Sequence, residues 1–159
     1  MKKKGEIEPL LYRTRSPETP RDGTPVYLDF NTGNLSANGQ FSFQAWRPST
    51  PETFNGPFEW RFKIAIKNGG LRGFDEEFPF MAPTNGYTDS IEISMVPGVS
   101  PDWSYTWGTN FFFYFGQPPK YGRMVFGTGG SSHGFGMQYW FNPSGSRNLE
   151  FDPSKQISP

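Results

Sequence analysis

The sequence contains no cysteine, a single histidine (His133) and no surplus of charge, with 15 Lys plus Arg residues against 15 Asp plus Glu residues. Without cysteine, disulfide scaffolds, zinc–thiolate sites and thiol catalysis are excluded, and one histidine cannot form a multi-histidine metal site within one chain. Zero net charge argues against nucleic acid as a partner, because neutralising phosphates requires a basic surplus. No stretch approaches the roughly 18 consecutive apolar residues of a membrane helix, so we predict no membrane span.

Glycine (19 residues) and proline (16 residues) are abundant instead. Together they make up about 22% of the chain, against roughly 12% in an average protein. Long helices are disfavoured, because these two residues are the worst helix formers. The 17 phenylalanines outnumber leucine, isoleucine and valine combined. A phenylalanine-rich interior between frequent turns indicates an all-β fold.

Alternation of apolar and polar residues predicts where the strands lie. In the clearest run, residues 58–67, one face carries only apolar side chains: Phe58, Trp60, Phe62, Ile64 and Ile66. Charged residues occupy most of the other face, as in a half-solvated strand. Similar patterns predict strands at 26–30, 41–46, 90–96, 110–116, 123–127 and 136–142. Short strands at intervals of roughly 8–12 residues favour a single-domain antiparallel β-sandwich, jelly-roll-like, with about eight strands and negligible helix.

The composition divides the chain into three parts. Residues 1–25 are basic at the start and rich in proline, so we predict an arm that cannot order itself without docking on another surface, such as a neighbouring subunit. Residues 26–151 form the predicted sandwich, and residues 152–159 form a short C-terminal tail. The basic start lacks the apolar core of a secretory signal, which predicts either a cytoplasmic protein or an export signal upstream of this chain.

Several short segments have distinctive amino-acid sequences. They are YLDFNTG (27–33), EFPFMAP (77–83) followed by Gly86-Tyr87, KYGR (120–123) and NPSGSRNLE (142–150). In this order they resemble a set of uncharacterised bacterial domains of secreted or surface proteins, over roughly residues 26–150. The resemblance implies a stand-alone β domain and favours a secreted or cell-surface setting. It implies no catalytic residue, because that set has no established activity.

The sequence lacks the residue patterns of several common catalytic sites. The glycine-rich stretch 127–136 lacks the Lys-Ser/Thr pair and the following helix of a phosphate-binding loop, and no nucleophile elbow frames Ser131 or Ser132 beside His133. Glu92 is the only carboxylate in its predicted strand, whereas jelly-roll glycoside hydrolases need two on one face. We therefore predict a non-enzymatic protein, with a glycoside hydrolase-like jelly roll as the less favoured alternative.

One acidic run is a weak candidate for metal binding. Asp75, Glu76 and Glu77 are consecutive, and hard cations such as calcium prefer oxygen ligands. A solvated turn is the favoured interpretation of this run. We predict no cofactor, with calcium as the alternative.

Large aromatic residues recur at every second position in Trp103, Tyr105 and Trp107. In an extended chain these rings would lie on one face, about 6.6–6.8 Å apart, and flat rings with polar tips suit the apolar faces of sugars. Trp46 and Trp140 each fall on the face opposite the main hydrophobic set of their strands. Ordinary packing of these rings over the core is the alternative interpretation.

The prediction from sequence is thus a non-catalytic module that binds carbohydrate, either a polysaccharide or a glycoprotein glycan. Its predicted ligand-binding residues are Trp103, Tyr105 and Trp107, which we call the aromatic ladder, together with Trp46, Arg47 and Trp140. The alternative is a structural subunit of a bacterial surface or viral filament assembly. In that case the N-terminal arm and the same aromatic residues would make subunit contacts, which adds self-association to the predicted partners.

Overall fold

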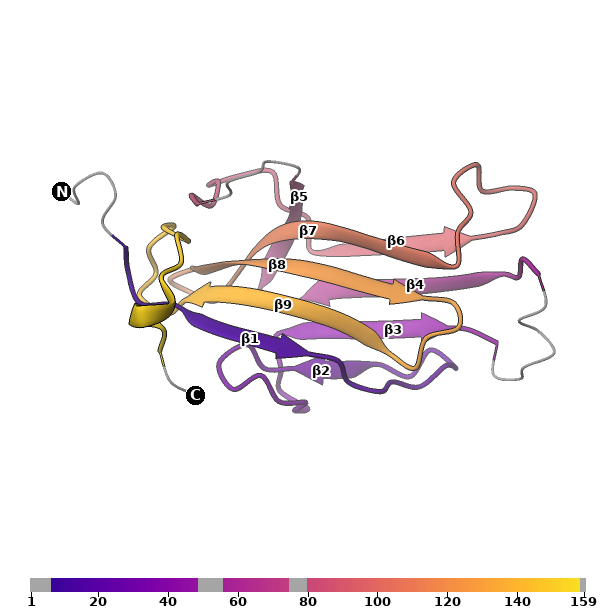
Figure 1. Ribbon diagram of the computed structural model, residues 1–159, viewed down its shortest axis with the longest axis horizontal. Helices are drawn as coiled ribbons and strands as arrows, with labels where there is room; N and C mark the ends of the chain where they lie inside the picture. Colours follow the sequence, from indigo (N-terminus) through magenta and orange to yellow (C-terminus); the bar gives the residue numbers. More distant parts are fainter. Residues whose placement is uncertain (1–6, 49–55, 75–79, 158–159) are drawn as a thin grey trace.

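Two antiparallel β-sheets pack face to face in the computed structural model, which describes residues 7–48, 56–74 and 80–157 (Figure 1). The five-stranded sheet has the order β1 (Leu11–Arg15), β9 (Phe135–Asn142), β8 (Lys120–Gly129), β7 (Thr106–Phe115) and β5 (Gly69–Phe74). The four-stranded sheet has the order β2 (Val26–Leu28), β3 (Phe41–Trp46), β4 (Trp60–Ile66) and β6 (Ser90–Met95). Within these described residues the one helical element is a 3₁₀ turn, η2 (Pro153–Lys155). The prediction of an all-β sandwich is confirmed.

One strand comes from the segment that the composition assigns to an N-terminal arm. β1 pairs antiparallel with β9, and its inward-facing residues include Arg13 and Arg15, which donate hydrogen bonds to the carbonyls of Asn31 and Gly33. Charged residues at inward positions hide the apolar alternation that marks a strand, so the pattern missed it. The described part of this segment docks on its own chain, and β1 belongs to the sandwich.

The connection between β4 and β5 passes from one sheet to the other. The turn at 68–70 has hairpin-type residues, but β4 and β5 lie in different sheets, and β5 pairs with β7. Asn68 adopts a left-handed backbone with φ of 57°, a conformation that asparagine tolerates better than most residues. The chain therefore crosses from one sheet to the other at this turn.

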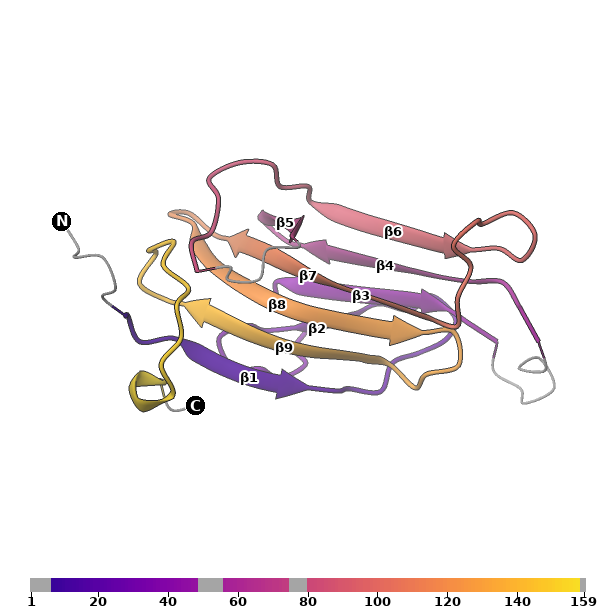
Figure 2. The same cartoon turned by 45° about the horizontal axis from the view of Figure 1, so that its top comes forward.

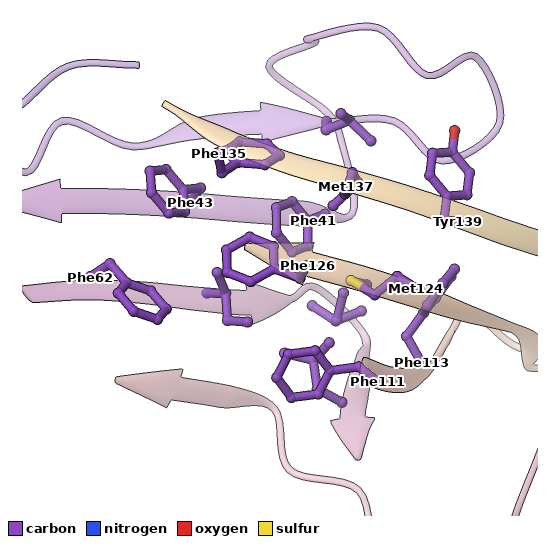
Figure 3. Packing of buried hydrophobic residues seen from close by; sticks show 14 of the residues in the cluster. Phe41, Phe43, Phe62, Phe111, Phe113, Met124, Phe126, Phe135, Met137 and Tyr139 are labelled. Carbon is purple, nitrogen blue, oxygen red and sulfur yellow. The ribbon is translucent and has the colours of Figure 1, made fainter. Parts of the chain in front are cut away.

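Phenylalanine rings fill the space between the sheets (Figure 3). Phe30, in the loop after β2, stacks on Phe113 of β7 with ring centroids 4.1 Å apart and an interplanar angle of 13°. The Tyr139 ring meets Phe30 edge to face, and the Tyr139 hydroxyl donates a 2.8 Å hydrogen bond to the Phe30 carbonyl. Phe43 and Phe135 contact each other across the two sheets at 4.8 Å. The core thus joins both sheets through aromatic pairs.

A second, smaller hydrophobic cluster lies on the outer face of the five-stranded sheet. Ala82, Phe112 and Leu149 are its buried members. Arg123, on the outer face of β8, donates to the Leu149 carbonyl, and burial lowers the pKa of its guanidinium to about 10. The loops that contain Ala82 and Leu149 therefore cover part of this face and shape its surface.

Replacing Phe113 with alanine is expected to lower the free energy of unfolding by roughly 3–5 kcal/mol, because a fully buried ring is lost from the core. Urea unfolding followed by circular dichroism measures this loss. Val125→Ala is the matched control, since Val125 lies in the neighbouring strand β8 but is 45% exposed. Its effect should stay within about 0.5 kcal/mol. Similar losses in the two variants would contradict the packing described here.

Candidate functional site

The predicted aromatic ladder packs over one end of the sandwich. Strand β7 begins only at Thr106, so Trp103 and Tyr105 lie in the preceding loop and meet edge to face, with an interplanar angle of 78°. Trp103 and Trp107 are half-buried and pack against the main core. Tyr105 is 42% exposed. The three rings do not form the flat row that an extended chain would give.

Contacts with the core explain this arrangement. The Trp103 indole donates a 2.9 Å hydrogen bond to the Phe58 carbonyl, and the Trp107 ring lies 5.1 Å from the ring of Phe62. Two of the three rings are therefore held by the fold. Tyr105 alone presents much of its surface to solvent.

Arg47 is not available to a ligand. Its side chain is 6% exposed, and its guanidinium donates hydrogen bonds to the carbonyls of Gly129 and Gly134 and to the hydroxyls of Ser132 and Thr19. Burial, with a smaller contribution from the nearby charge of Arg21, lowers the pKa of Arg47 to about 10. The predicted binding residue instead fixes the turn between β8 and β9.

Trp46 and Trp140 lie on the outer faces of their sheets, but arginines cover their rings. The Arg61 guanidinium carbon lies 4.1 Å from the Trp46 ring centroid, and that of Arg123 lies 3.9 Å from the Trp140 ring centroid. Tyr12 also contacts Trp140, with ring centroids 5.1 Å apart. A sugar could stack on either indole only after displacing a cation–π contact.

The acidic run Asp75, Glu76 and Glu77 lies outside the described residues, so its proposed role in metal binding stays a prediction. In the part of the chain that the structure describes, no three His, Cys, Asp or Glu residues are grouped to hold a metal ion. The same part contains no helix with the length and apolar character that crossing a bilayer requires.

A pocket that the sequence pattern did not predict lies on the five-stranded sheet, at the opposite end of β7 from the aromatic ladder. Its volume is about 330 Å³. Three tyrosines, Tyr87, Tyr114 and Tyr121, line it together with Thr84 and Asn85. We call it the tyrosine pocket.

The strand register brings these tyrosines together. Tyr114 of β7 and Tyr121 of β8 are directly opposite each other, with ring centroids 6.0 Å apart. On the other side of Tyr114, β5 contributes Gly70, where an added Cβ would lie 2.8 Å from the Cβ of Tyr87 and 3.0 Å from the Thr88 carbonyl oxygen. The missing side chain lets Tyr87 pack edge to face with Tyr114 at 4.9 Å.

The polar groups of the tyrosine pocket differ in their availability. The Tyr87 hydroxyl donates a 2.8 Å hydrogen bond to the Pro83 carbonyl, and burial, with a smaller contribution from Tyr121, raises the pKa of Tyr87. The Tyr87 phenol is therefore uncharged and held in place, and it forms one side of the pocket. No hydrogen bond joins the hydroxyls of Tyr114 and Tyr121 to other described residues. Those two hydroxyls can bind a ligand from outside.

No family model, curated protein or solved structure matches the chain. The fold therefore defines its class, an all-β sandwich with a large buried aromatic core, which is compatible with a binding module.

Replacing Trp107 with alanine is expected to lower the free energy of unfolding by roughly 2–3 kcal/mol, because a half-buried indole leaves the core. Tyr105→Ala is the control at the exposed position of the same ladder and should cost less than about 1 kcal/mol. Thermal or urea unfolding of both variants makes the comparison. A Trp107→Ala protein as stable as the wild type would show that this ring is free for a ligand.

Proposed function

We propose that this protein is a non-catalytic module that binds carbohydrate, and that the tyrosine pocket is its binding site. The observation that carries the proposal is the meeting of three tyrosine rings around one pocket, with two hydroxyls that have no hydrogen bond to other described residues. Sugars have apolar C–H faces and hydroxyl edges, and a phenol offers a ring for the first and a hydrogen bond for the second.

The size and charge of the pocket narrow the ligand class. About 330 Å³ lies at the lower end of the volumes of small-molecule sites, roughly 300–1,000 Å³, which suits one or two sugar rings better than a long segment of a chain. Among the residues that the structure describes, none of those lining the pocket carries a charge. This uncharged lining suits a neutral sugar, and the Arg72 guanidinium beside it is engaged by the Asn85 carbonyl.

The lining also favours binding over hydrolysis. Glycoside hydrolysis in most families requires two carboxyl groups flanking the scissile bond, and neither aspartate nor glutamate is among the described residues that line the tyrosine pocket. Those residues supply donors, acceptors and rings but no carboxyl group to protonate a leaving oxygen. Recognition without catalysis is the function that these residues support.

A glycan array combined with pull-down on insoluble polysaccharides tests the proposal. We expect the wild type to bind at least one neutral glycan, and Tyr114→Ala to weaken that binding at least about tenfold, since a stacking ring and its hydroxyl together contribute more than about 1.4 kcal/mol. Tyr121→Phe should weaken binding by a smaller factor, because only the hydroxyl is removed. Unfolding midpoints measured in parallel separate lost binding from lost structure.

Tyr105→Ala is the matched control, an exposed tyrosine in the aromatic ladder at the other end of β7. It should bind like the wild type. If Tyr105→Ala abolished retention while Tyr114→Ala left it intact, the ladder would be the binding site. A wild-type protein that retains no neutral glycan would refute the proposal.

A further inference from the structure

The two sheets have four edge strands, and within the described residues the chain itself flanks three of them. Beside β2, Leu28 forms a bridge with Leu35, and beside β5, Leu71 forms a bridge with Thr88. At the edge of β1, the side-chain amide of Gln156 in the C-terminal segment donates a hydrogen bond to the Tyr12 carbonyl. Strand β6 is the most open edge, because no described strand lies beyond it (Figure 2) and the Ser100 hydroxyl contacts it only near its end, at the Ser94 carbonyl and the Val96 amide.

The register shows which backbone groups of β6 are open. The Ile66 amide donates to the Asp89 carbonyl, and the β4–β6 pairing continues from that point. Because hydrogen bonds alternate along an antiparallel pair, Ile91, Ile93 and Met95 bond to β4. The backbone N–H and C=O groups of the alternate residues, Ser90, Glu92 and Ser94, point away from β4. Only the Ser94 carbonyl has another described partner, the hydroxyl of Ser100.

The residues of this edge read the same in both directions, Ser-Ile-Glu-Ile-Ser over 90–94. In an antiparallel pairing about a two-fold axis through Glu92, Ser90 would lie opposite the partner's Ser94, and Ile91 opposite the partner's Ile93. Both isoleucines are half-buried at the rim of the core, so the pairing would also cover apolar surface. Such self-complementarity is what a two-fold interface requires.

The charge at the centre of the pairing is balanced within each copy. Glu92 would face the partner's Glu92, and like charges in that position are unfavourable. Each Glu92 carboxylate, however, lies 3.3 Å from the guanidinium of Arg61 on β4. Each copy therefore brings an ion pair with no net charge to the axis.

We propose that β6 is a self-association edge, through which two copies of this chain pair antiparallel over residues 90–94 and join their four-stranded sheets into one continuous sheet. A single pair of short strands makes a small interface, typical of weak and reversible association. The tyrosine pocket lies on the other sheet and takes no part in this contact, so either proposal can fail without the other.

Analytical ultracentrifugation over a range of protein concentrations, from about 1 μM to about 1 mM, tests the pairing. We expect a reversible monomer–dimer equilibrium for the wild type. Glu92→Pro should be monomeric throughout that range, because proline removes an outward N–H and an edge strand tolerates it at such a position. Its circular dichroism spectrum should match the wild type.

Glu92→Gln is the matched control, since it keeps the outward N–H and changes only the carboxylate that pairs with Arg61, and it should still dimerise in this concentration range. Ser90→Pro removes a second outward N–H and serves if Glu92→Pro does not fold. Hydrogen exchange of the wild type gives a readout without substitution, with the Glu92 amide exchanging more slowly as concentration rises. A wild type that is monomeric at the highest concentration, or a dimer that both proline variants retain, would overturn the proposal.

Discussion

Aromatic packing between the two sheets is the interaction on which the rest of the structure depends. Phe30 stacks on Phe113 and accepts a hydrogen bond from Tyr139 at its carbonyl, which joins a loop to strands β7 and β9 of the opposite sheet. Large rings fill the interior at the inward positions of the strands, and each ring buries roughly 150–250 Å². The tyrosine pocket lies outside this core, on the outer face of the five-stranded sheet, and the β6 edge lies at the rim of the core.

Buried and half-buried arginines hold the loops that this glycine- and proline-rich chain requires. Arg13 donates to the Asn31 carbonyl, Arg47 to two carbonyls of the β8–β9 turn, and Arg123 to Leu149. Irregular backbone leaves carbonyls without strand partners, and a guanidinium with five N–H donors can satisfy several of them at once. This explains why an arginine next to an outward tryptophan, as in Trp46-Arg47, serves the fold and not a ligand.

Local patterns predicted the parts of the structure that depend on local sequence. The alternation in 58–67 located β4, whereas β1 was missed because Arg13 and Arg15 occupy inward positions. The ladder from Trp103 to Trp107 was read as a flat row because an extended chain was assumed there, whereas Trp103 and Tyr105 lie in the loop before β7, which begins at Thr106. The tyrosine pocket could not be predicted, because Tyr87, Tyr114 and Tyr121 meet only through the order β5–β7–β8.

The most direct test of the central claim is an NMR titration of the protein with soluble neutral oligosaccharides, following the backbone amide shifts of every assigned residue. We predict saturable shifts that cluster at residues 84–87 and at Tyr114 and Tyr121, at the tyrosine pocket. Shifts confined to residues 103–107, or none with any neutral sugar, would contradict the claim that outward tyrosines on this aromatic-cored sandwich form a carbohydrate site.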